Sequence, residues 1–167
     1  KVPLDILLYC FIEVCRGLSY VHNKKASDGT PLGVVHRDIS PQNVILSYAG
    51  QIKIIDFGVA KARYKEGKTE SGVLKGKFAY MSPEQARSDR IDHRSDIFSL
   101  GTLLWELLTG ERLFKRKTNH ETVQAIQKAK YDAATLSRPT ADKDFDKIIK
   151  KALQKNPKNR YQDAADM

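Results

Sequence analysis

Three oxygen-bearing side chains, Asp38, Asn43 and Asp56, follow one another at a spacing that could do chemistry. Asp38 belongs to the run His-Arg-Asp-Ile-Ser-Pro-Gln-Asn, which Asn43 closes, and Asp56 opens the tripeptide Asp-Phe-Gly after an apolar run. Carboxylate and amide oxygens are the ligands that Mg²⁺ prefers, and a carboxylate near a hydroxyl can accept its proton. Side chains of these types could therefore hold a divalent cation and serve as a general base.

Two local elements would position these side chains. Apolar residues recur at helical spacing over residues 3–22, which predicts a helix with a broad buried face. The β-branched runs Val44–Leu46 and Ile52–Ile55 are separated by a short segment that contains a glycine, which predicts a small hairpin. The segment that carries the first aspartate would then join helix to hairpin, and Asp56 would end the second strand.

The rest of the chain divides into a long loop and a helical part. Residues 58–77 show no hydrophobic period and are rich in charge and glycine, which is typical of a long functional loop. Helices are predicted at about 84–87, 95–108, 120–130 and 142–155. The expected fold is one mainly α domain over residues 1–167, with a small β-hairpin and one long loop.

Composition narrows the class of protein. The 167 residues are 41% hydrophobic and 29% charged, which excludes a disordered chain. The net charge of +9 raises the question of nucleic acid, but no aromatic platform or nucleic-acid motif accompanies it, so no nucleic-acid partner is expected. Cys10 and Cys15 form neither a disulfide framework nor a zinc spacing. With no signal peptide and no apolar run of membrane length, a cytoplasmic location is expected, an anchor elsewhere in a longer protein being left open.

Three motifs in a fixed order carry a resemblance to a known family: His-Arg-Asp at 36–38, Asp-Phe-Gly at 56–58 and Ser-Pro-Glu at 82–84. From Pro3 to Met167 the chain resembles the large, C-terminal lobe of a eukaryotic-like serine/threonine protein kinase of the bacterial type. The resemblance implies transfer of the ATP γ-phosphate to a protein hydroxyl, with Mg²⁺, or Mn²⁺ in its place, as the metal. It makes the hairpin a neighbour of the catalytic loop and residues 58–77 the activation loop.

The resemblance implies a role for each residue of the site. Asp38 would orient the substrate hydroxyl and accept its proton, while Asn43 and Asp56 would hold magnesium against the phosphates. Taken singly, the three could be a turn former, a strand cap and a strand terminator, but each would have to imitate a role in register. Other positions match supporting parts of the family. Ile45 would lie under the adenine ring, and His36 and Phe57, followed by Gly58, would belong to the spine that links the two lobes. Asp96 would brace the catalytic loop, and Glu84 and Arg160 would form a buried ion pair.

Simpler roles remain open for three of the supporting residues. Ile45 could serve only the hairpin core. Asp96 could be an early-helix aspartate that interacts with the helix dipole. Arg160 could be a solvated surface arginine.

Regulation is expected on the activation loop. Arg37, beside the catalytic aspartate, and Lys61 would gather a phosphate that orders the loop. Val73 stands at the usual phosphorylation position and cannot be phosphorylated, so Thr69 and Ser71 are the candidates. The alternative is that both are ordinary polar loop residues.

One departure from the family concerns the charge near the γ-phosphate. Ser40 stands where serine/threonine kinases usually carry a lysine, and Lys77 stands where they usually carry a threonine. We expect Lys77 to reach back to Ser40 and Asp38 and supply the missing positive charge, because an ammonium group acts as a point charge. The alternative is a solvated Lys77 and low activity.

Two parts of a kinase are missing from the sequence. None of the ten glycines forms a Gly-x-Gly-x-x-Gly loop, and no Val-Ala-Ile-Lys strand precedes the first helix. The chain's own small lobe is therefore an expected partner, together with a protein substrate and a kinase dimer that phosphorylates its activation loops. A pseudokinase scaffold or allosteric module is the main alternative. A small-molecule phosphotransferase and tyrosine specificity are disfavoured by the motif wording.

Overall fold

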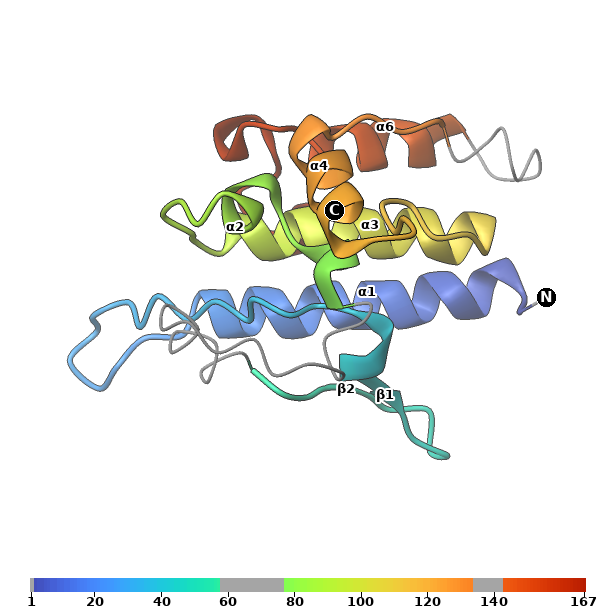
Figure 1. Ribbon diagram of the computed structural model, residues 1–167. Coiled ribbons are helices and arrows are strands. Elements are labelled where there is room, and N and C mark those ends of the chain that lie inside the picture. The colour runs from blue at the N-terminus through green and yellow to red at the C-terminus, as the bar shows by residue number, and fades with distance from the viewer. Residues whose placement is uncertain (1, 58–76, 134–142) are drawn as a thin grey trace.

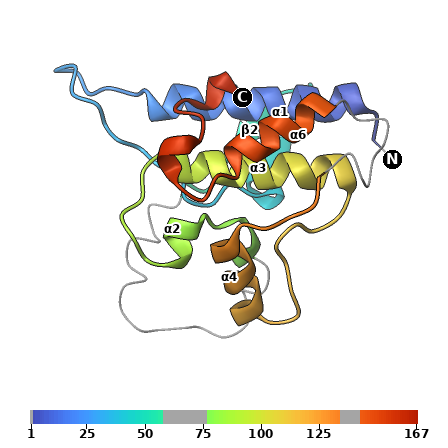
Figure 2. The same ribbon diagram turned by 90° about the horizontal axis from the view of Figure 1, so that it is seen from above.

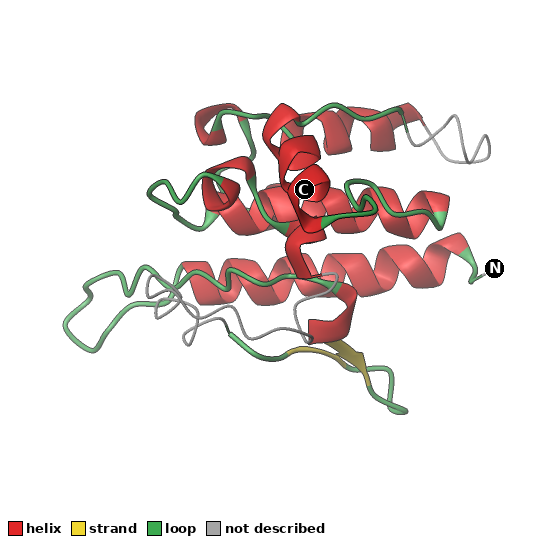
Figure 3. Cartoon of the chain, viewed as in Figure 1, coloured by secondary structure: helices red, strands yellow, loops and turns green. Residues whose placement is uncertain are grey.

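Three helices form the framework of the molecule. The computed structural model describes residues 2–57, 77–133 and 143–167. In Figure 1, α1 (Leu4–His22), α3 (Arg94–Thr109) and α6 (Lys143–Ala152) lie one above another, with α3 in contact with both of the others. The shorter helices α2 (Pro83–Ala86) and α4 (Asn119–Lys128) contact each other beside this stack. Figure 3 shows how strongly helices dominate the described chain.

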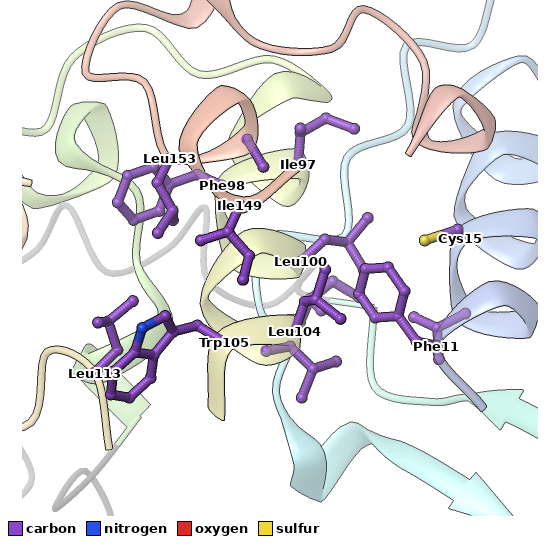
Figure 4. Packing of buried hydrophobic residues seen from close by; sticks show 14 of the residues in the cluster. Phe11, Cys15, Ile97, Phe98, Leu100, Leu104, Trp105, Leu113, Ile149 and Leu153 are labelled. Atoms are coloured by element: carbon purple, nitrogen blue, oxygen red, sulfur yellow. The ribbon is translucent and has the colours of Figure 1, made fainter. Parts of the chain in front are cut away.

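Helix α3 is the centre of the core. Every residue from Ser95 to Trp105 is buried, which is the pattern of a helix covered on all sides. Gly101 lets α6 approach closely, since a Cβ there would lie 2.8 Å from the Cβ of Ala152. The helix ends at Thr109 and is capped by Gly110, whose φ of 78° is the left-handed conformation that glycine adopts at low cost. Figure 4 shows apolar side chains of α1, α3 and α6 meeting around this helix.

The predicted hairpin is present and packs against α1. Strands β1 (Val44–Leu46) and β2 (Ile52–Ile54) pair antiparallel, with Val44 opposite Ile54. At Gly17 of α1 an added Cβ would lie 3.2 Å from Ile54, so helix and strand are in close contact. The first helix and the hairpin therefore confirm the sequence prediction for the elements on either side of the Asp38 segment.

Two predicted helix ends were wrong. Helix α4 ends at Lys128, two residues before the predicted end, because Ala129 adopts a left-handed φ of 49°. Helix α6 ends at Ala152, three residues early. Beyond this end, Arg160 donates to the carbonyl oxygens of Gln154 and Lys155, which holds the chain in a course that leaves the helix. The predicted activation loop lies outside the described residues up to position 76, and a 3-10 turn begins at Lys77. Among the described helices, none is long and apolar enough to cross a membrane.

Candidate active site

The segment that carries Asp38 is anchored to the first turn of α3. The buried Asp96 carboxylate accepts hydrogen bonds from the backbone N–H groups of His36 and Arg37, each at 2.8 Å. Its Oδ2 atom also lies 2.8 Å from Nε2 of His22, at the end of α1. One carboxylate therefore joins the central helix, the first helix and the backbone directly before Asp38.

Two residues of this region hold the left-handed backbone conformation. Arg37 has a φ of 70° and Asp56 a φ of 56°, which is uncommon for residues with a Cβ. The Arg37 carbonyl oxygen accepts a hydrogen bond of 2.9 Å from Nε2 of Gln85 in α2. Such conformations cost about 1–3 kcal/mol and persist where surrounding contacts enforce them, which is typical of functional sites.

His36 connects the two aspartate-bearing segments. Its fully buried ring contacts the carbonyl oxygen of Ile55 through Nε2 at 3.0 Å, and the backbone N–H of Asp38 donates to Nδ1 at 3.2 Å. This pair of bonds requires a neutral ring with its proton on Nε2, because Nδ1 accepts. The ring also packs on Phe57, with centroids 4.6 Å apart. The backbone on either side of Asp56 is thereby fixed relative to Asp38.

Asn43 closes the turn that begins at Asp38. Its Nδ2 donates to the backbone oxygen of Asp38 at 2.7 Å, and its own carbonyl oxygen accepts from the N–H of Ile55 at 2.9 Å. Because the amide nitrogen is committed to the backbone, the amide oxygen is the group that Asn43 can offer to a ligand. Asp38 and Asn43 are buried, whereas Asp56 is exposed.

A buried ion pair ties α2 to the C-terminal part of the chain. The Arg160 guanidinium binds both oxygens of Glu84, at 2.7 and 2.8 Å, and both side chains are almost fully buried. Ser95 adds a hydrogen bond of 2.7 Å to Glu84. Burial pulls the pKa of Glu84 upward, but the hydrogen bonds and charge of Arg160 outweigh it and hold the pKa below its usual value. Glu84 is therefore ionised in the folded protein at neutral pH.

A second, partly buried polar cluster involves Tyr80, three residues after Lys77. The Tyr80 hydroxyl donates to Oε2 of Glu106 at 2.5 Å, and Arg112 binds the same oxygen at 2.9 Å as well as the tyrosine hydroxyl. Burial raises the pKa of Tyr80, and the hydrogen bond to Glu106 raises it further. This cluster attaches the turn that follows the predicted activation loop to the end of α3.

The structure places the predicted residues unequally. Ser40 is buried next to the Asp38 turn, and Ile45 is 45% exposed on β1. The described part of the chain excludes Gly58, Lys61, Thr69, Ser71 and the side chain of Lys77. Sequence reasoning missed His22 and Gln85, whose contacts depend on tertiary packing. Only the Ser-x-x-Gln spacing at 82–85, which forms a capping box, gave a local signal for Gln85.

Comparison with known proteins agrees with this arrangement. The profile of the protein kinase domain family matches residues 5–166. The chain belongs to the protein kinase domain family. Curated relatives include the tyrosine-protein kinase MasK of Myxococcus xanthus, 42% identical over 160 residues. They also include the serine/threonine-protein kinase PknB of Mycobacterium tuberculosis, 39% identical over 160 residues, and that of Mycolicibacterium smegmatis, 38% identical over 159.

These relatives are much longer than the kinase chain described here. The matches cover 96% of this chain but 25% of MasK, and 93% of this chain but 24% of each PknB. Among solved structures, the twitchin kinase region of C. elegans matches with a TM-score of 0.76 at 23% identity. That match covers 94% of this chain and 26% of twitchin's, and it shows the protein kinase fold.

Proposed function

We propose that these residues form the large lobe of a protein kinase and transfer the γ-phosphate of ATP to a serine or threonine hydroxyl. The observation that carries the proposal is the single hydrogen-bonded unit around Asp38. Asn43 bonds to the Asp38 carbonyl, and His36 bonds to both aspartate-bearing segments. Phosphoryl transfer depends on positioning and charge neutralisation, and a rigid unit of this kind meets the first requirement.

In this proposal Asp38 orients the hydroxyl of the protein substrate and accepts its proton. The Asp96 carboxylate keeps the backbone before Asp38 in place, and the Asn43 amide fixes the backbone after it. A positioned general base contributes roughly 10²–10⁴-fold to a rate. The substitution Asp38→Asn keeps the shape of the side chain and should lower kcat by about 10²-fold or more while leaving ATP affinity little changed.

The donor set suits a hard divalent cation. Asn43 offers an amide oxygen and Asp56 an exposed carboxylate, and these are ligands that Mg²⁺ accepts together with phosphate oxygens. When bound with ATP, Mg²⁺ would neutralise charge on the phosphates. Asp56→Asn should therefore raise the Mg²⁺ concentration needed for half-maximal activity, and Mn²⁺ should support activity in its place. An unchanged metal requirement in Asp56→Asn would contradict this role.

We further propose that Lys77 supplies the positive charge that Ser40 cannot. Ser40 is buried and its backbone oxygen accepts from the N–H of Asn43, so it lies on the same turn as the base. Lys77→Ala should lower kcat in the intact protein, and Ser40→Lys with Lys77→Thr should restore much of the loss. If Lys77→Ala leaves kcat unchanged, the proposal that Lys77 supplies the positive charge missing at Ser40 is wrong.

Regulation by loop phosphorylation forms a separate part of the proposal. Arg37 lies half-buried beside Asp38, where with Lys61 it would bind a phosphate on Thr69 or Ser71. Peptide mapping of the active, full-length protein by mass spectrometry tests this directly. If neither Thr69 nor Ser71 carries phosphate, both candidates are wrong. If one does, a second copy of the kinase is the expected source of the phosphate.

A tyrosine acceptor is the second candidate, because MasK, at 42% identity, is named a tyrosine-protein kinase. The lysine typical of serine/threonine kinases is also absent at Ser40. Phosphoamino acid analysis after reaction with a mixed protein substrate separates the two acceptors. Failure of the intact protein to label any hydroxyl, with ATP binding retained, would favour the pseudokinase alternative instead.

A further inference from the structure

A concave surface lies at the C-terminal end of α3, and none of residues 36–43 lines it. The cleft has a volume of about 980 Å³ and is bounded by α3, the α3–α4 connection, the chain that leaves α4, and α6. In Figure 2 these two connections run between α4 and the C-terminal end of α3. Trp105, Leu113 and Leu153 form its apolar floor and belong to the core seen in Figure 4.

The rim of the cleft is basic. Among the described residues that line it are six cations and three carboxylates. A neighbouring hollow of about 590 Å³ along α4 shares three of these cations and adds Lys117, so the basic surface continues beyond the cleft. The six cations of the cleft are Arg112, Arg116, Lys128, Lys130, Lys150 and Lys155.

Some of this charge has a local explanation. Lys128 and Lys150 lie in the last turns of α4 and α6, where a cation complements the helix dipole. Arg112 is paired with Glu106. Neither explanation covers Arg116 and Lys130, which lie outside the helices.

Arg116 is held in place by neutral groups. Its Nη1 donates to the backbone oxygens of Leu113 and Lys115, at 3.1 and 3.0 Å. Within the described ranges neither Arg116 nor Lys130 forms an ion pair with a carboxylate. The Arg116 guanidinium is thus positioned at the junction of the two hollows while its charge remains uncompensated by a described carboxylate.

We infer that this cleft binds an acidic segment of a partner protein. Carboxylates of the segment would lie against Arg116, Lys130 and Lys155, and an apolar side chain would enter over the floor. The charge complementarity supports an anionic occupant. The volume stands at the upper end of the roughly 300–1,000 Å³ of small-molecule sites, which leaves room for several residues.

The lining favours a peptide over other anions. Most of the cations are lysines, which act as point charges and lack the planar fork that suits a single phosphate. Three carboxylates in the lining would repel a chain with a charge on every unit, whereas a peptide can place neutral residues beside them. Binding of single-stranded nucleic acid relies on exposed aromatic rings for stacking, whereas of the two rings in the described lining Trp105 is only 6% exposed and Tyr131 is half-buried.

Fluorescence anisotropy with the intact protein and a labelled peptide of alternating Glu-Glu-Leu units, without ATP, tests the inference. The double variant Arg116→Glu with Lys130→Glu should weaken the dissociation constant at least about tenfold, because two attractions become repulsions. The matched control Lys25→Glu with Lys158→Glu changes the net charge equally at exposed positions outside the cleft and should bind as the wild type does.

Thermal unfolding monitored by circular dichroism shows whether the charge-reversal variant folds. If it does not, the neutral double variant Arg116→Gln with Lys130→Gln replaces it in the binding assay. This pair should give an intermediate loss of binding. Equal binding by wild type and cleft variants would overturn the inference, as would the absence of peptide binding. Tighter binding of an eight-nucleotide oligothymidylate than of the peptide would also overturn it, in favour of nucleic acid. The assay uses no phosphoryl transfer, so its result is independent of the catalytic proposal.

Discussion

Asp96 shows how one buried side chain can set the geometry of the segment that carries Asp38, the proposed catalytic segment. Its two oxygens accept hydrogen bonds from the backbone N–H groups of His36 and Arg37, and one of them also contacts the ring of His22. The carboxylate therefore links α3 to α1 and to the segment before Asp38. A buried carboxylate is tolerated where hydrogen bonds replace its lost hydration. The left-handed Arg37 between these contacts indicates that the backbone conformation is enforced by them.

Asp96→Asn should therefore loosen the catalytic segment. The amide keeps one oxygen but turns N–H groups toward the N–H donors, so we expect a loss of about 1–3 kcal/mol in unfolding free energy and a fall in kcat. Asp144→Asn, at an exposed position in the first turn of α6, is the matched control for the helix-dipole effect, and the exposed ion pair with Lys147 that it also breaks should contribute little. Urea unfolding and steady-state kinetics measure both. If both variants lose the same small amount of unfolding free energy, Asp96 acts only through the helix dipole and does not hold the segment before Asp38.

The Glu84–Arg160 pair leads to a prediction about pH. The folded-state pKa of Glu84 lies below its usual value of 4.5, so the ionised group stabilises the fold fully above about pH 4.5. This contribution is lost as the pH falls through the folded-state pKa. Glu84→Gln should cost about 3–5 kcal/mol at neutral pH, because it leaves Arg160 buried and unpaired.

The difference in unfolding free energy between wild type and Glu84→Gln should shrink in acid, and urea unfolding from pH 7 to pH 3 measures it. Asp89→Asn breaks an exposed ion pair with Arg87 on the neighbouring loop and should cost within about 0.5 kcal/mol at every pH. A constant difference between wild type and Glu84→Gln across this range would contradict the prediction.

At the scale of elements, periodicity and motif spacing predicted the helices and the hairpin, while contacts that sequence does not record set their ends. Helix α4 stops where Ala129, a residue with no preference for the left-handed region, adopts it. Helix α6 stops where Arg160 takes the carbonyl oxygens that follow it. The motifs placed Asp38, Asn43 and Asp56, but His22 belongs to none of the motifs, so its contact with Asp96 could not be predicted.

The crossing of α3 and α6 provides a test of packing against helix propensity. Alanine is a better helix former than glycine by about 1 kcal/mol, but a Cβ at Gly101 would lie 2.8 Å from Ala152 and 3.1 Å from Leu153. Gly101→Ala should therefore destabilise the protein by about 1–3 kcal/mol. Gly17→Ala in α1 is the matched control, since its Cβ meets only the flexible end of Ile54. Thermal unfolding compares them, and stabilisation by Gly101→Ala would show that the helices can separate without cost.

At the scale of the whole molecule, the described residues would form one wall of the proposed nucleotide site. The proposed catalytic segment is held by α3 and the hairpin packs on α1, while the apolar side chains of Ile45 and Leu46 on the hairpin are 45% and 54% exposed. Apolar groups that face water beside a catalytic segment are what a covering lobe or an adenine ring would bury. The sequence also contains no glycine-rich phosphate loop.

We therefore expect the isolated 167-residue chain to bind Mg-ATP at least about tenfold more weakly than the intact protein, because ligand sites normally bury about 70–90% of the ligand surface. It should show no measurable phosphoryl transfer. Isothermal titration calorimetry and a radiolabelled phosphate assay measure the two quantities. Circular dichroism establishes that the chain is folded, and Asp38→Asn in the same preparation detects contaminating kinases. Robust turnover by the isolated chain, absent from its Asp38→Asn variant, would show that this single wall suffices for catalysis.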